Sequence, residues 1–155
     1  MSPENKAKLN NRVVKAAEAA LEAKGYVSPL DVVIGIGWLD MATVKRWRQG
    51  QIRYLERVVQ SNLPRISAAM KMFRGWAAAR GLKPSVTKYV THGKHRQPLR
   101  FSASGDHTIE RLYSTHWVSP VLSEKKRERL AEQAKRAAAE AEGTIEIEQG
   151  GAGAG

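Results

Sequence analysis

The sequence predicts a mainly helical α+β fold, a helical bundle with a small β-hairpin and a charged C-terminal helix. Apolar residues recur at helical spacing through much of 5–80, and β-branched and aromatic residues gather in 86–102. The 155 residues, 42% of them hydrophobic, suffice for one domain with a buried core. We expect this domain at 5–120, the charged helix at 121–142 and a disordered tail at 143–155.

Capping residues as well as apolar spacing predict the helices of the bundle. The expected helices span 5–24, 29–34, 41–49, 52–61 and 64–81. Ser28 and Asp40 have the short polar side chains that cap helix N-termini, and Gly25 suits the end of the first helix. Gly35 and Gly37 are expected to break the second helix, because glycine is a poor helix former.

The pattern changes after the fifth helix, where β-branched and aromatic residues predict strands. We expect strands at 86–91 and 99–102, joined by the basic loop 92–98 into a hairpin.

Two further helices are expected near the end of the chain. Asp106 is suited to cap a helix over 107–114. Its inner side is expected to carry Ile109, Leu112 and Tyr113. The stretch 122–142 is rich in Ala, Glu, Lys and Arg, so it favours a helix, with i,i+4 pairs such as Glu132 with Arg136. This last helix has few apolar side chains to pack, and an adaptor that binds a protein partner through it is one alternative function.

Most of the net charge lies in the middle of the chain. The protein has 26 Lys and Arg against 15 Asp and Glu, a net charge of +11. The stretch 57–105 holds ten of these cations and no acid, so it carries +10. Such a stretch favours a nucleic-acid partner, because a polyanion relieves the repulsion and releases its counterions. The alternatives are a solvated basic face, an anionic membrane surface or an acidic protein.

Several classes of protein are excluded by what the sequence lacks. It has no cysteine, which excludes disulfides, thiolate nucleophiles and cysteine-ligated zinc or iron–sulfur sites. Its longest apolar run, 32–39, is far shorter than the ~20 residues of a membrane span, and its start lacks a secretory signal. No Walker or dinucleotide-binding motif occurs. We therefore expect a soluble, cytoplasmic protein that is not an enzyme, with no cofactor and no membrane partner.

A short basic segment, 41–50, carries the most specific functional signal. If it is helical, Val44 and Trp47 fall on one side and can anchor it in a core. Its other sides then carry Lys45, Arg46, Arg48 and Gln49. Arg and Gln are side chains that pair with guanine and adenine edges when a helix enters the major groove. The alternative is a basic amphipathic helix that only packs in the bundle.

Residues 29–51 resemble a helix-turn-helix segment of the phage-repressor type, mainly in the string at 43–51. The resemblance implies that the short helix beginning at Pro29 supports a recognition helix beginning at Met41. The sequence departs from the motif in its connection, because the expected turn at 35–40 exceeds the usual length.

Four other strings are similar to a group of uncharacterised bacterial proteins. They lie at 25–32, 54–58, 98–101 and 104–106. The resemblance spans about 10–130, and it implies one bacterial domain without implying an activity.

Cations elsewhere in the sequence are candidates for phosphate contacts. In the DNA-binding interpretation Arg53 joins 45–49 at the groove. The cations expected to neutralise phosphates are Arg74, Arg80, Lys83, Lys94, Arg96 and Arg100. The basic stretch 88–100, with Lys88 at its start and the aromatic residues Tyr89 and Phe101 nearby, is suited to grip a minor groove or to clamp RNA by stacking. An RNA- or ribosome-binding factor that uses the same cations is therefore the alternative. The alternative for the stretch 88–100 itself is a solvent-exposed hairpin whose aromatic residues belong to the core.

All four histidines lie within 25 residues, next to two acids. They are His92, His95, His107 and His116, with Asp106 and Glu110 nearby. This composition is compatible with a metal-dependent nuclease, in which a metal stabilises the phosphodiester transition state. No HNH or His-Glu-x-x-His spacing occurs, so the sequence assigns no catalytic or metal-binding residue.

Overall fold

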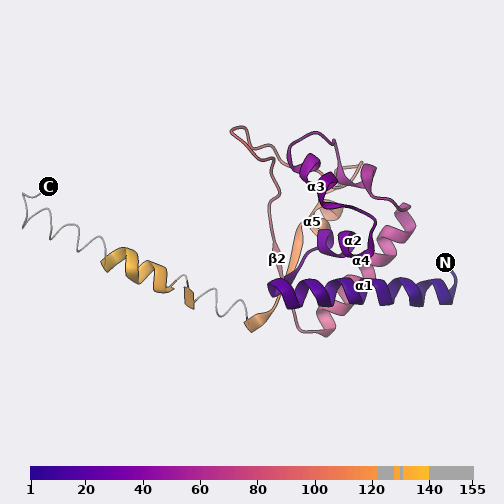
Figure 1. The fold of residues 1–155 in the computed structure, drawn as a ribbon, viewed down its shortest axis with the longest axis horizontal. Coiled ribbons are helices and arrows are strands. Elements are labelled where there is room, and N and C mark those ends of the chain that lie inside the picture. Colours follow the sequence, from indigo (N-terminus) through magenta and orange to yellow (C-terminus); the bar gives the residue numbers. More distant parts are fainter. Residues whose placement is uncertain (122–127, 130, 140–155) are drawn as a thin grey trace, which may run out of the picture. The chain divides into compact units, whose positions relative to one another are not determined.

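The computed structural model describes residues 1–121, 128–129 and 131–139. It is mainly helical with a small antiparallel sheet (Figure 1), which confirms the predicted α+β class. The chain divides into two units, 1–120 and 121–155. The helices of the first unit are α1 (Pro3–Lys24), α2 (Pro29–Ile36), α3 (Met41–Arg48), α4 (Leu63–Ala79) and α5 (His107–Ser114), with one 3-10 turn, η1 (Leu55–Val58). Its strands are β1 (Tyr26–Val27), β2 (Lys83–Val86) and β3 (Thr115–Val118).

The helix boundaries follow the capping residues, as predicted. Ser28 and Asp31 form a capping box at the start of α2, in which each side chain accepts a hydrogen bond from the other residue's backbone N–H. Asp40 accepts a hydrogen bond from the backbone N–H of Thr43 at 2.7 Å, and this bond holds the pKa of Asp40 below its usual value. Gly25 ends α1 in the left-handed conformation, with φ 78°.

Gly35 does not break α2, contrary to the prediction. The helix continues through it to Ile36. A Cβ placed at Gly35 would lie 2.5 Å from the Cβ of Ala16 in α1, closer than two non-bonded carbon atoms can approach. Glycine at this position therefore allows α1 and α2 to pack in close contact.

The predicted helix at 52–61 is wrong. In that stretch only η1 forms, as a single 3-10 turn. The backbone N–H groups of Leu55 and Glu56 donate to the carbonyls of Arg100 and Phe101, at 3.0 and 2.8 Å. Because these N–H groups are hydrogen-bonded to a distant segment, they are not available for an α-helix, although the local apolar spacing favours one.

The sheet has the strand order β1-β3-β2, and both pairs are antiparallel. The hairpin predicted over 86–102 forms only in part. Val90 and Pro98 form an isolated antiparallel bridge, and the N–H groups of Leu99 and Thr91 donate to the carbonyls of Tyr89 and Gln97 at 2.9 and 2.8 Å, but 87–102 contains no regular strand.

The rest of both predicted strands bonds to other segments. Val86 ends β2, which pairs with β3, and the N–H of Thr87 donates to the carbonyl of Ser114. The carbonyls of Arg100 and Phe101 accept from 55–56 instead of from the first predicted strand.

The core is centred on aromatic side chains that join distant segments. Trp47 and Phe101 are almost fully buried, and their ring centroids are 5.0 Å apart. Phe73 of α4 is buried in the same cluster. In the described part of the chain, no helix is both long and apolar enough to cross a membrane.

In the second unit, the described residues 128–129 and 131–139 are helical. Arg136 and Glu132 form the predicted i,i+4 ion pair, at 3.8 Å. The remainder of the predicted helix, and the predicted tail, lie outside the described residues.

Candidate nucleic-acid interface

The connection between α2 and α3 has four residues, 37–40, because α2 continues to Ile36. Gly37 ends α2 in the left-handed conformation, with φ 95°, and its backbone N–H donates to the carbonyl of Ile34 at 3.0 Å. The next two residues are buried and fix the turn against the core. Two helices joined by a short turn with one glycine have the spacing of a helix-turn-helix segment. The turn therefore has the usual length of this motif, whereas the sequence predicted a longer one.

α3 has a buried side and an exposed side. Val44 and Trp47 lie in the core, and the indole Nε1 of Trp47 donates to the carbonyl of Arg100 at 2.9 Å. The exposed polar residues of α3 and its C-cap are Lys45, Arg46 and Gln49. Since burial and the indole hydrogen bond set the rotation of the helix, these side chains face solvent on one side of it.

The loop after β2 returns to the C-terminal end of α3. The backbone N–H of His92 donates to the carbonyl of Arg48 at 2.9 Å, and the Arg48 guanidinium lies 5.1 Å from the ring centroid of Tyr89. A hollow of about 400 Å³ opens at this contact, lined by Arg48, Lys88, Val90, Thr91, His92, Gly93 and Arg96. We call the surface formed by Lys45, Arg46, Arg48, Gln49, Lys88, His92 and Arg96 the basic end of the domain.

Two residues of the basic end, Lys88 and His92, were not assigned to the site from the sequence. Their presence in the basic loop was the only sequence signal for them. They lie beside Arg48 because two segments about 40 residues apart in the chain are in contact, and local sequence patterns do not indicate such a contact.

Thr91 shapes the tip of this loop. Its backbone N–H donates to the carbonyl of Gln97 at 2.8 Å, and its hydroxyl accepts a hydrogen bond from the Gln97 N–H at 2.9 Å. The same hydroxyl donates to the carbonyl of His95 at 3.0 Å. These bonds close the loop on itself and leave Lys94 and Arg96 exposed.

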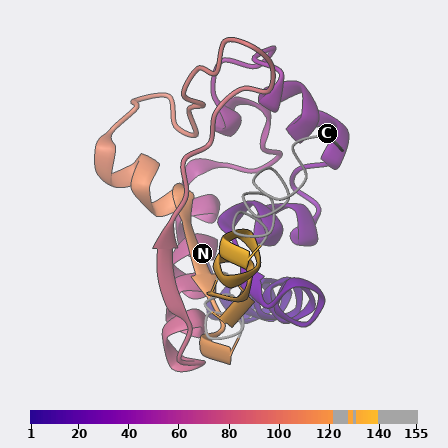
Figure 2. The same cartoon turned by 90° about the vertical axis from the view of Figure 1, so that its left-hand side faces the viewer.

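Four of the predicted phosphate contacts do not contribute side chains to the basic end. Arg80 is paired with Glu18 of α1 at 2.7 Å, and Lys83 begins β2. The turn between α4 and β2 lies at the opposite end of the domain from α3, as Figures 1 and 2 show. Arg74 lines a separate pocket beside α5. Arg100 turns back onto the loop that follows it, where its guanidinium donates to two backbone carbonyls.

The cations of the basic end form no ion pair among the described residues, and the nearby acid is Asp40, whose pKa Arg46 helps to lower. Neither 41–55 nor 87–105 contains Asp or Glu, and Arg53, exposed after α3, adds a further cation. The ion pairs within the described residues join Lys24 to Asp31, Arg80 to Glu18 and Arg136 to Glu132. Cations held close together without counter-charge repel one another, and an external anion relieves that repulsion.

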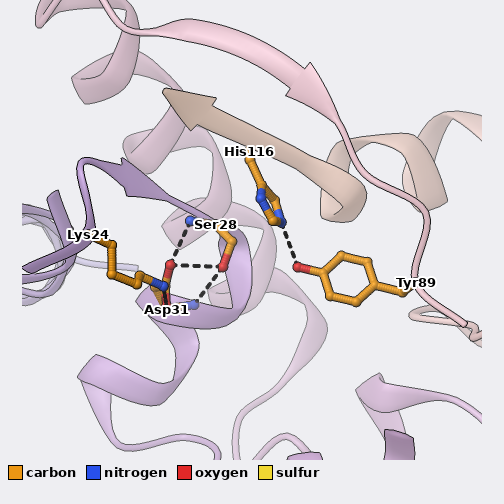
Figure 3. Close-up of polar contacts among 5 residues, drawn as sticks. All are labelled: Lys24, Ser28, Asp31, Tyr89 and His116. Carbon is orange, nitrogen blue, oxygen red and sulfur yellow. Dashed lines mark hydrogen bonds and ion pairs between the residues drawn. The ribbon is translucent and has the colours of Figure 1, made fainter. Parts of the chain in front are cut away.

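Two separate sets of polar contacts lie at the base of the loop (Figure 3). The phenol oxygen of Tyr89 and Nε2 of His116 are 2.7 Å apart, and the carboxylate of Asp31 contacts both Lys24 and Ser28. Burial raises the pKa of Tyr89 to about 12 and lowers the pKa of His116. At neutral pH both rings are therefore uncharged, and their hydrogen bond joins the loop to β3 without a buried charge.

The residues of the nuclease alternative are used in separate contacts. His116 contacts Tyr89, Asp106 accepts hydrogen bonds at the start of α5, and Glu110 accepts the backbone N–H groups of 101–102. Among the residues that the structure describes, no three His, Asp or Glu side chains come together as a metal site. The described part of the chain thus provides no assembled metal site for a nuclease.

Comparison of the chain with protein-family models, curated proteins and solved structures found no significant match. The assignment of a function to the basic end therefore depends on its own geometry and charge.

Proposed function

We propose that the protein binds duplex DNA through the basic end, with α3 in the major groove and the loop 87–98 against the phosphate backbone. One observation carries the proposal. At Arg48, an exposed helix side that bears Arg and Gln continues into a basic hollow, and the cations of this surface form no ion pair in the described chain. On this proposal the protein is a binding protein without a catalytic step, and it acts in the bacterial cytoplasm.

Two kinds of contact follow from the arrangement. Arg46 and Gln49 are three residues apart on the exposed side of α3, and their side chains have donors that pair with guanine and adenine edges. Lys88 and Arg96 line the hollow beside α3, where they would neutralise phosphates. Phosphate contacts fix the position of the protein on the duplex, whereas base contacts select the sequence.

The first test compares two lysines that differ in place but not in charge. Lys88 lines the hollow, whereas Lys83 lies in β2 at the opposite end, and both are exposed. We expect Lys88→Ala to weaken binding of a fluorescent duplex and to lower the slope of log K against log salt by ~0.9. Lys83→Ala should change neither quantity. Anisotropy titrations at several salt concentrations measure both, and equal effects of the two substitutions would contradict the proposed surface.

The second test concerns sequence preference. Arg46→Lys keeps the charge but removes the planar pair of donors. We therefore expect this variant to retain affinity for random duplex and to lose the preference that wild type shows in selection from a random library. An unchanged preference would show that α3 does not read bases. A hairpin RNA that competes more strongly than duplex DNA would instead favour the RNA-binding alternative.

A further inference from the structure

A separate pocket lies between α4, α5 and the loop that precedes α5. It has a volume of about 340 Å³. Its apolar lining includes Leu63, Met70, Phe73, Ile109, Leu112 and Tyr113. A mainly apolar, concave site of this size is at the lower end of the range that holds one small molecule.

α5 forms the pocket by leaving its apolar edge uncovered. The sequence predicted Ile109 and Leu112 on the inner side of this helix, but each remains 38% exposed. Polar contacts hold the helix in this position, since Glu110 accepts the backbone N–H groups of Phe101 and Ser102 at 2.9 and 3.2 Å. The apolar edge is thus presented at the pocket instead of being packed into the core.

The polar groups of the pocket leave one cation without a partner. The carboxylate of Glu56 accepts hydrogen bonds from the backbone N–H of Ala103 at 3.2 Å and from the hydroxyl of Tyr113 at 3.4 Å. Arg74 is half-buried on α4, and within the described part of the chain it has no hydrogen bond and no ion pair. A free guanidinium beside an apolar surface is suited to a molecule with an anionic end and an apolar body.

We propose that this pocket binds a small amphipathic carboxylate. Its apolar chain would lie against Phe73, Ile109 and Leu112, and its carboxylate would accept two hydrogen bonds from Arg74. An uncharged molecule of the same shape would fill the apolar part but would leave the guanidinium unpaired. Binding at this pocket does not depend on the proposed DNA-binding function.

One wall of the pocket lies close in the chain to a residue that contacts α3. The residues 102–104 line the pocket, and the carbonyl of Arg100, just before them, accepts the hydrogen bond from Trp47. A ligand that displaces this loop therefore acts on the contact that sets the rotation of α3. If the proposed function holds, on which this step rests, the carboxylate is an effector of DNA binding.

The test titrates the full-length protein with octanoate and with octanamide, which have equal chain length and differ in charge. Calorimetry measures affinity, and the methyl NMR signals of Ile109 and Leu112 report the location. We expect octanoate to bind at least about tenfold more tightly, because hydrogen bonds to charged groups contribute more than neutral ones. Arg74→Gln should abolish this difference and leave octanamide binding unchanged. Arg111→Gln, the same change at an exposed position of α5 outside the pocket, should alter neither affinity.

Several results would overturn the proposal. It fails if neither probe binds, or if octanoate and octanamide bind with equal affinity. It also fails if Arg74→Gln and Arg111→Gln have equal effects, or if the methyl signals that shift lie outside the pocket. Concentration-dependent methyl shifts without ligand, together with self-association in ultracentrifugation, would also overturn it by identifying this face as an interface between copies.

A separate titration with duplex DNA distinguishes the two proposals. Octanoate binding in a protein with no affinity for DNA would refute the DNA-binding function and leave the pocket assignment intact. DNA affinity that is unaffected by saturating octanoate would refute the effector role alone.

Discussion

The close contact between α1 and α2 leads to a sharp prediction about Gly35. Alanine at this position would place a Cβ 2.5 Å from the Cβ of Ala16 and 3.3 Å from its Cα. Neither atom of Ala16 can rotate away, because both are fixed by the backbone of α1. The two helices would therefore have to move apart, and α2 supports the turn that leads to α3.

Two effects of opposite sign determine the expected change in the free energy of unfolding. Gly to Ala within a helix gains about 1 kcal/mol. An extra methyl group in a filled space costs about 1–3 kcal/mol, and a clash with the backbone favours the upper part of that range. We therefore expect Gly35→Ala to destabilise the protein by about 1–2 kcal/mol, with a fall in Tm of roughly 4–8 °C.

A double-mutant cycle in urea, followed by circular dichroism, separates the two effects. Ala16→Gly alone should cost about 1 kcal/mol through helix propensity. Combined with Gly35→Ala, it removes the 2.5 Å contact and leaves only the 3.3 Å contact to the Cα of residue 16, so the double variant should return to near the wild-type stability. The expected coupling is then about 2–3 kcal/mol, within the range known for contacting residues. A stabilised Gly35→Ala variant, or no coupling with Ala16→Gly, would refute the close packing.

Three further predictions concern the contacts around α3. Trp47→Phe removes the hydrogen bond to Arg100, whose carbonyl retains the Leu55 N–H, so we expect a loss of about 1–3 kcal/mol in the urea-derived free energy of unfolding. Because burial raises the pKa of Tyr89 from 10.0 to about 12, the unfolded chain loses that proton first as pH rises. Stability should therefore fall between about pH 10 and 12, and urea midpoints should show a smaller fall in Tyr89→Phe. Because burial lowers the pKa of His116 from 6.5, the unfolded chain gains that proton first as pH falls. Stability should decrease below about pH 6.5, and the same midpoints should show a smaller decrease in His116→Gln.

Local sequence signals predicted the helix starts well and the long-range contacts poorly. Ser28, Asp40 and Asp106 begin their helices as expected, because an N-cap bond involves residues only two or three positions apart. The helix predicted at 52–61 does not form, because its backbone groups bond to a segment about 45 residues away. The predicted hairpin is reduced to one bridge and its flanking hydrogen bonds for the same reason, since Val86 pairs instead with β3, which follows α5 in the chain.

The same distinction applies to the basic end. The periodicity of α3 indicated which of its residues are buried, and the structure places Val44 and Trp47 there. Charge alone did not separate Lys88, which lines the hollow, from Arg100, which is turned toward its own loop. Their roles depend on how the loop folds, and this information is not contained in composition.

The positions of the acids explain why no cation of the basic end forms an ion pair within the described chain, although Arg46 lies close enough to the α3 cap Asp40 to help lower the pKa of that carboxyl. Asp31 and Asp106 are used at helix N-termini, where they accept backbone hydrogen bonds. Glu56 and Glu110 accept backbone N–H groups of the loop before α5, and Glu18 pairs with Arg80 at the opposite end of the domain. Each of these acids stabilises the fold where it stands, so none can move to the cations of the basic end without the loss of a cap or a loop contact. On the proposed function, the phosphate backbone of the duplex would supply the anions that pair with these cations, at a regular spacing that a continuous basic surface can use.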